Sequence, residues 1–165
     1  MSLAEPYRSI LKALLEALRR RFRDKLISLV VYGSVARGEF RRDSDLDILV
    51  IIEGLPKGRF KRQDLFMEVE KEVEPLIEDL WDEGYYVSIS PLLRTPEEAS
   101  RLTPIYLDMV EDAIILYDRG SFFENILNRL RKRLNELNAK RVRMGKMWYW
   151  VLKEPYEFGE VIEIE

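Results

Sequence analysis

Cysteine and histidine are both absent from the 165 residues of the chain. Their absence excludes disulfides, thiol nucleophiles, zinc sites built from Cys and His, and every catalytic triad that needs a histidine. Any bound metal must therefore have oxygen ligands, which favours hard cations such as Mg²⁺ or Mn²⁺. Proton transfer is left to Asp, Glu, Lys, Tyr or the substrate itself.

Long hydrophobic runs are missing as well. No apolar run approaches the roughly 18 residues that span a bilayer, and charged residues interrupt the N-terminal leucines, unlike in a secretory signal. These absences predict a cytoplasmic protein with no membrane partner. Glutamine occurs once, at Gln63, while Arg, Lys and Glu are abundant, a bias typical of heat-adapted proteins.

Charge of one sign does not dominate the chain, whose net charge is −3. Nucleic acid therefore stays an open partner that the net charge does not indicate, although basic residues are concentrated between 129 and 146. The length suffices for one domain with a sizeable core and is short for two.

The spacing of apolar residues predicts helices alternating with short strands. Helical periodicity covers 5–24, 64–83 and 121–138, and a capping pattern at Thr95 starts a further helix. Continuous β-branched or aromatic runs predict strands at 26–32, 46–52, 85–92 and 113–117. Pro75 is expected to bend or split its helix, and Pro91 to end the third strand.

This order of elements predicts an α/β (α+β) fold with a short mixed sheet and helices packed on it. We expect residues 1–120 to form this domain, and residues 121–165 to add a C-terminal helix and β-strand extension packed on the same domain. Two β-prone runs, at 147–152 and 161–164, predict a hairpin or added strands in that extension.

The chemistry is concentrated at residues 30–50, where an apolar strand runs into Gly33-Ser34 and a short helix. Such a turn leaves unpaired N–H groups for a phosphate, and glycine lets the phosphate approach the backbone. Arg37 is placed to meet phosphate charge or to pair with Glu39. Gly33 and Gly38 have the GxxxxG spacing, but the Lys-Ser/Thr that a Walker loop needs does not follow.

A pair of acids follows this turn. Asp45 and Asp47, at i and i+2 of a strand, point to the same side, so their carboxylates repel each other unless a cation lies between them. A divalent ion that also binds substrate phosphates would satisfy both acids. Ser44 is placed to orient a carboxylate. A purely structural polar turn would not explain Asp47 inside an apolar run.

These residues carry a resemblance to the DNA-polymerase-β-type nucleotidyltransferase superfamily. More narrowly, the stretch resembles the minimal nucleotidyltransferases, whose pattern is GSxARGxxxxxSDxD. The likeness covers residues 26–52, extends to about 92, and has no diagnostic motif beyond. The matching residues are Gly33, Ser34, Ala36, Arg37, Gly38, Ser44, Asp45 and Asp47.

The resemblance implies a polymerase-β palm-like fold and a nucleoside triphosphate, with ATP the expected donor, held by Gly33 and Ser34. Asp45 and Asp47 would be catalytic ligands of one or two Mg²⁺ (or Mn²⁺) ions, and Arg37, Gly38 and Ser44 would assist nucleotide binding. An NMP group would then pass to an acceptor that the sequence does not identify: protein, RNA or small molecule.

One family feature is missing. The family uses a third carboxylate on a later strand, but the strand at 85–92 has no acid, and Ser88 stands at the expected position. Either Glu97 or Glu98 folds back to supply the acid, or the protein is a catalytically weak Mg-nucleotide-binding, antitoxin-like partner. A third reading, which needs no nucleotide, is a structural α/β domain with an incidental motif.

The resemblance also implies a partner protein. Many minimal nucleotidyltransferases are paired with a helical HEPN protein as toxin and antitoxin, and some adenylylate it. In this chain the aromatic, basic stretch at 140–156 is the candidate acceptor or partner surface, because such side chains stack on bases and contact phosphates. The alternative is a strand packed on the domain with its basic residues in solvent.

Overall fold

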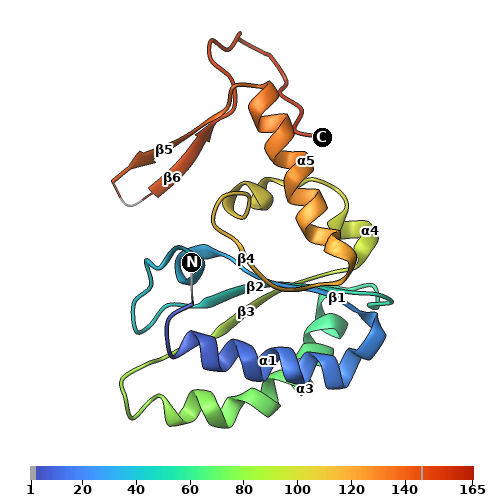
Figure 1. Ribbon diagram of the computed structural model, residues 1–165, viewed down its shortest axis with the longest axis vertical. Coiled ribbons are helices and arrows are strands. Elements are labelled where there is room, and N and C mark those ends of the chain that lie inside the picture. Colours follow the sequence, from blue (N-terminus) through green and yellow to red (C-terminus); the bar gives the residue numbers. More distant parts are fainter. Residues whose placement is uncertain (1–2, 146) are drawn as a thin grey trace.

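A four-stranded mixed sheet forms the centre of the computed structural model, which describes residues 3–145 and 147–165 (Figure 1). The strands are β1 (Leu26–Val31), β2 (Leu46–Ile52), β3 (Ile89–Arg94) and β4 (Ile114–Asp118), in the order β3-β2-β1-β4. β1 is antiparallel to β2 and β4, whereas β2 and β3 are parallel. β3 and β4 are therefore the edges of this sheet.

Helices cover both faces of the sheet. α1 (Tyr7–Phe22) and α3 (Arg59–Asp79) lie below it in Figure 1, and α4 (Pro96–Ala99) and α5 (Phe122–Glu136) lie above it. The short α2 (Gly33–Arg37) joins β1 to the loop before β2, and 3₁₀ turns occupy Arg23–Lys25, Pro104–Asp108 and Arg119–Ser121. None of the helices in the described part of the chain is long and apolar enough to cross a membrane.

Two hydrophobic clusters, one on each face, follow from the alternation of side chains along the strands. Every residue of β1 is buried, as expected for a strand covered on both sides. Leu29 and Ile48 pack toward α1 and α3, while Val30 and Leu49 pack toward α5 and the 3₁₀ turn at Pro104–Asp108. The predicted mixed α/β fold is confirmed.

Asp118 ties β4 to the start of α5. Its carboxylate accepts hydrogen bonds from the backbone N–H groups of Phe123 and Glu124, both at 3.0 Å. It also accepts one from the hydroxyl of Ser28 at 2.6 Å, which satisfies a side chain that is fully buried in β1. One carboxylate thus caps a helix and pairs a polar group inside the sheet.

The third strand differs from its prediction. It begins at Ile89 rather than at residue 85 and runs through Pro91 to Arg94. A proline is tolerated here because β3 is an edge strand, where a residue whose N–H would point away from the sheet has no ladder bond to lose. The expectation that Pro91 ends the strand was wrong.

Pro75 also fails to divide its helix. α3 is one continuous helix of 21 residues that contains Pro75 and begins at Arg59, five residues before the predicted start. The burial of Val69, Val73 and Ile77 along one side of α3 keeps the helix on the sheet through the proline.

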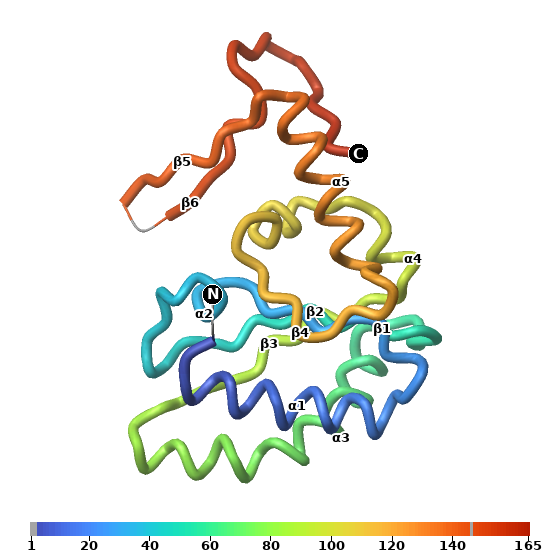
Figure 2. The backbone as a smooth tube through the Cα atoms, viewed as in Figure 1, coloured from blue at the N-terminus to red at the C-terminus, as the bar shows by residue number. Residues whose placement is uncertain are grey.

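The C-terminal hairpin forms with a different partner strand. β6 (Met147–Val151) pairs antiparallel with β5 (Lys140–Met144), not with residues 161–164, which contain no strand. Gly145, with φ of 62°, follows β5 at the turn. The hairpin projects from the top of α5 as a separate two-stranded arm in Figures 1 and 2.

Candidate active site

The turn after β1 lies directly against the second aspartate. Gly33 has φ of +74°, a conformation that side chains disfavour, and a Cβ atom at this position would overlap Oδ2 of Asp47. The backbone N–H of Tyr32 donates to the carbonyl of Asp47 at 3.0 Å, which fixes the end of β1 beside β2. The fold therefore brings Gly33 and Ser34, at the start of α2, to the predicted pair of acids.

Asp47 is half-buried at the beginning of β2, and Asp45 is exposed just before it. Burial raises the pKa of Asp47, and the neighbouring charge of Asp45 raises it further. A hydrogen bond from Ser90 and the charge of Arg37 act in the opposite direction. Two repelling carboxylates that share a site are a donor set suited to a divalent cation with oxygen ligands.

Two serines lie beside this pair of acids, Ser88 immediately before β3 and Ser90 within it. The hydroxyl of Ser88 donates to Oδ1 of Asp45, and the N–H of Leu46 donates to the carbonyl of Ser88 at 2.8 Å. Ser90 lies opposite Asp47 in the parallel register. The sequence identified Ser88 but gave Ser90 no role, because the pairing register that places Ser90 beside Asp47 depends on tertiary structure.

The charge of a further carboxylate, which the sequence did not single out, acts on Asp47. Asp108, at the end of the 3₁₀ turn Pro104–Asp108, contributes to the raised pKa of Asp47. The pKa of Tyr32 is raised to about 12, mainly by burial, next by the charge of Asp47 and then by that of Asp108. Among the described residues no group of three or more His, Cys, Asp or Glu side chains is arranged to hold a metal ion.

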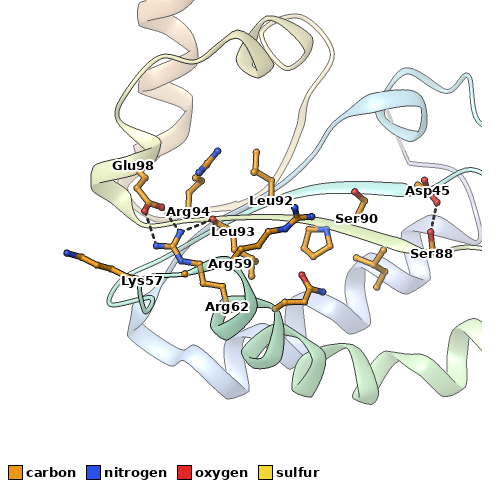
Figure 3. A pocket seen from close by; sticks show the side chains of 14 residues that line it. Asp45, Lys57, Arg59, Arg62, Ser88, Ser90, Leu92, Leu93, Arg94 and Glu98 are labelled. Carbon is orange, nitrogen blue, oxygen red and sulfur yellow. Dashed lines mark hydrogen bonds and ion pairs between the residues drawn. The ribbon is translucent and has the colours of Figure 1, made fainter.

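Glu98 does not fold back toward the aspartates. Its carboxylate forms a two-pronged ion pair with Arg62, with Nη1–Oε2 at 2.7 Å and Nη2–Oε1 at 2.9 Å. Glu98 also completes the capping box with Thr95 at the start of α4. The hydrogen bond from Arg62 is the main cause that lowers the pKa of Glu98 to about 2. Glu98 and Asp45 lie at opposite ends of the pocket in Figure 3.

The remaining predicted residues shape the loop after α2. Arg37 pairs with Glu39 at 3.1 Å, the alternative that the sequence left open, and Gly38 ends α2 in the left-handed conformation. Ser44 accepts a hydrogen bond from the backbone N–H of Arg41 at 2.8 Å, which closes the turn before Asp45. All three therefore lie in the connection between Gly33 and the acids.

The C-terminal hairpin reaches this loop through Arg143, whose guanidinium lies 3.6 Å from the carboxylate of Glu39. Arg141 and Arg143 lie over the ring of Trp148, at 4.5 and 5.2 Å from its centroid. The indole N–H of Trp150 donates to the carbonyl of Leu107 at 3.0 Å and fastens β6 to the domain. Trp150 therefore fits the alternative in which this strand packs on the domain.

A pocket of about 860 Å³ opens from Asp45 along β3. Asp45 and Ser88 lie at one end, and the other end is bounded by the start of α3 and by Glu98 (Figure 3). The pocket is lined by residues of β3 and of the loop and helix that begin at Lys57, and not by Gly33 or Ser34.

Comparison with known proteins gives a consistent picture. A family model described as a nucleotidyltransferase domain matches residues 11–145. A putative protein adenylyltransferase of Methanocaldococcus jannaschii is 30% identical over 142 residues, which are 85% of this chain and 91% of that protein. Protein adenylyltransferase MntA of Thermococcus cleftensis is 42% identical over 73 residues, 44% of this chain and 67% of MntA.

Among solved structures, the spectinomycin adenyltransferase AAD(9) from Enterococcus faecialis, determined with ATP and spectinomycin, has a TM-score of 0.50 and 14% identity. The alignment covers 79% of this chain and 66% of that one. This likeness supports the fold.

Proposed function

This chain belongs to the family of nucleotidyltransferase domains, and from that premise we propose that it transfers the AMP group of ATP to a hydroxyl of a protein acceptor. Nucleotidyl transfer follows from the family. ATP and a protein acceptor are proposed because the relatives in Methanocaldococcus jannaschii and Thermococcus cleftensis are named protein adenylyltransferases. The resemblance in the sequence adds a helical HEPN-type protein as the partner.

One observation carries the assignment of the site: the close approach of Gly33 to the carboxylate of Asp47. Glycine at that point lets the carboxylate of Asp47 lie directly against the backbone at the start of α2. A triphosphate bound by the N–H groups of that turn, with the hydroxyl of Ser34 as an additional donor, would therefore lie beside the acids. In this proposal Arg37 exchanges its pairing with Glu39 for a phosphate oxygen.

Asp45 and Asp47 fit a divalent ion, Mg²⁺ or Mn²⁺, which when bound would supply positive charge to the leaving pyrophosphate and polarise the acceptor hydroxyl. The chain's own residues orient the reaction. The acceptor oxygen forms a bond to the α-phosphorus, the bond from that phosphorus to the pyrophosphate oxygen breaks, and the proton of the hydroxyl is released. Ser88 holds Asp45 through its hydrogen bond.

The test combines purified protein, Mg²⁺, α-labelled ATP and the proteins that co-purify with the chain from its host. We expect the label to become covalently attached to one of those proteins, and Asp47→Asn to lower the rate by at least about a hundredfold. Labelling that is unchanged in Asp47→Asn would overturn the assignment of Asp47.

A second candidate function is favoured by the serines beside the two aspartates. These are Ser88, just before β3, and Ser90 within it, and neither side chain is a useful base at neutral pH or a strong metal ligand. The protein would then bind Mg-ATP and act as a catalytically weak, antitoxin-like partner.

Calorimetry separates the two candidates. Binding of Mg-ATP without turnover supports the second, and in that case Ser88→Asp should increase the transfer rate or tighten metal binding because it adds a third carboxylate beside Asp45. No change in either quantity for Ser88→Asp would count against Ser88 as the position of the third acid.

A further inference from the structure

The pocket along β3 lies on the opposite side of the acids from Gly33. In the sheet order β3-β2-β1, the turn at Gly33 follows β1, whereas the pocket follows the outer edge of β3. β2, which carries Asp47, lies between them. A triphosphate at Gly33 and a second molecule in the pocket would therefore reach the carboxylates from two different sides.

The pocket is positively charged. Lys57, Arg59 and Arg94 line it, and none of them forms an ion pair with any residue in the described ranges 3–145 and 147–165. Arg62, the fourth cation of the lining, is neutralised by Glu98. Three cations in the lining of one concave surface attract an anionic ligand.

The backbone edge of β3 is poorly suited to extending the sheet. Because the carbonyl of Ser88 accepts from Leu46, alternation directs the backbone groups of residues 89, 91 and 93 outward. Pro91 has no N–H to offer, and the carbonyl of Leu93 already accepts a hydrogen bond from Arg62 at 3.3 Å. A segment in this pocket would consequently be recognised mainly through its side chains.

The apolar part of the lining is aliphatic. Ile89, Pro91, Leu92 and Leu93 contribute it, and no aromatic side chain is among the described residues that line the pocket. Proteins that bind single-stranded nucleic acid combine basic grooves with aromatic rings on which bases stack. Cations together with an aliphatic wall fit a polypeptide with acidic side chains better than a nucleic acid.

We propose that this pocket binds an extended, acidic segment of the acceptor protein and presents a hydroxyl side chain of that segment to Asp45. Carboxylates of the segment contact Lys57, Arg59 and Arg94, and the hydroxyl lies at the end of the pocket formed by Asp45 and Ser88. The reaction assigned to this hydroxyl rests on the proposed function, whereas recognition of acidic peptide does not depend on it.

The experiment measures binding without nucleotide, by fluorescence anisotropy. The probe is a labelled synthetic peptide of about twelve residues in which Glu alternates with Ala around one central Tyr, and the comparison peptide has Gln in place of every Glu. We expect the Glu peptide to bind at least about tenfold more tightly, with an affinity that falls as salt is added.

Variants that remove charge from Arg59 and Arg94 test whether the peptide binds in this pocket. We expect Arg59→Gln with Arg94→Gln to weaken binding of the Glu peptide about twentyfold, since each of these charges contributes up to about fivefold. Arg59→Lys with Arg94→Lys should stay within about threefold of the wild type. The matched control, Arg21→Gln with Arg131→Gln, removes two exposed charges from α1 and α5 and should change binding less than about twofold.

Circular dichroism and thermal unfolding show whether each variant is folded, and the single Gln variants, each expected to lose about fivefold, replace a double variant that does not fold. Equal binding of the two peptides, or equal losses in the pocket and control variants, would overturn the proposal. So would a labelled oligouridylate that binds more tightly than the Glu peptide and loses affinity in the pocket variant, because the pocket would then bind nucleic acid.

The two proposals fail separately. Asp47→Asn should bind the Glu peptide as the wild type does, because the peptide contacts lie along β3. If the peptide binds as predicted but no AMP is transferred to any protein, only the proposed function is wrong. If AMP is transferred while Arg59 and Arg94 are without effect on peptide binding, only the pocket assignment is wrong.

Discussion

At the scale of single residues, Gly33 has a contact that the sequence did not predict. The Gly-Ser pattern predicts the close approach of a phosphate to the backbone, and the structure adds a carboxylate of Asp47 against the same residue. The backbone conformation alone would already favour glycine, since φ is +74°. Two separate constraints, conformation and space, therefore act on one residue.

A matched pair of variants separates these constraints. Gly54 has φ of +72° and nothing within 4 Å of an added Cβ, so Gly54→Ala carries the conformational strain alone. We expect Gly54→Ala to cost about 1 kcal/mol of unfolding free energy and Gly33→Ala about 2 kcal/mol or more. Urea denaturation measures both, and calorimetry should show a loss of Mg-ATP affinity in Gly33→Ala alone. Equal costs and equal affinities would contradict the role of Gly33.

The raised pKa of Asp47 predicts how the stability of the metal-free protein changes with pH. Burial, and after it Asp45, raises the pKa of Asp47, so the folded protein binds this proton more tightly than the unfolded chain does. Stability is then lost as the pH rises through the raised pKa, and the ionised carboxylate destabilises the metal-free protein at neutral pH. Asp47→Asn should remove that penalty.

We expect Asp47→Asn in EDTA at about pH 7 to unfold roughly 2 °C higher than the wild type, which corresponds to about 0.5 kcal/mol for a chain of this size. The difference should vanish near pH 3, where the wild-type carboxyl is protonated. Mg²⁺ should raise the melting temperature of the wild type more than that of the variant. A variant that melts below the wild type in EDTA would contradict this account of Asp47.

Residues that sequence reasoning missed were brought in by tertiary structure. Ser90 acquires its place from the parallel register of β2 and β3, and Asp108 reaches the site from a 3₁₀ turn more than sixty residues beyond Asp47 along the chain. Neither position has a local pattern that indicates its neighbours. Glu98, in contrast, could be proposed as the missing acid only because its bond to Arg62 is invisible in the sequence.

At the scale of elements, strands with continuous apolar runs were predicted to within a residue or two. β1 and β2 lie at or near 26–32 and 46–52 because burial on the interior of the sheet demands such runs. β4, a partly buried edge strand, lies within one residue of 113–117. β3 was misplaced at its start and beyond Pro91, because a proline can continue an edge strand where its missing N–H would point away from the sheet. The edge of the sheet formed by β3 is also the edge along which the pocket lies.

The junction between β4 and α5 is a testable element of the fold. Asp118→Ala removes two bonds to the first N–H groups of α5 and leaves the buried hydroxyl of Ser28 without its acceptor. We expect a loss of about 2–4 kcal/mol of unfolding free energy, measured by urea denaturation. Asp118→Asn keeps an acceptor oxygen and should lose about half as much. A cost below about 0.5 kcal/mol for Asp118→Ala would refute the capping role.

At the scale of the whole molecule, the sheet has a hydrophobic cluster on each face, and α5 supplies much of the second cluster through residues such as Phe123 and Leu130. We propose that residues 1–120 are the nucleotidyltransferase domain and residues 121–165 an extension on the same core. The fold class and family were predictable because one motif fixes both. The position of the hairpin was not predictable from the sequence, because the contact of Arg143 with Glu39 joins residues far apart in the chain.

The most direct measurement of the central claim follows two labels in parallel. Purified protein, Mg²⁺ and the co-purified acceptor are incubated with ATP labelled either at the α-phosphate or at the γ-phosphate, with Asp45→Asn and Asp47→Asn as controls. We predict that α-label becomes attached to the acceptor, that γ-label leaves as pyrophosphate, and that both variants block attachment. Attachment of γ-label, or attachment of α-label that survives both variants, would contradict nucleotidyl transfer at these two aspartates.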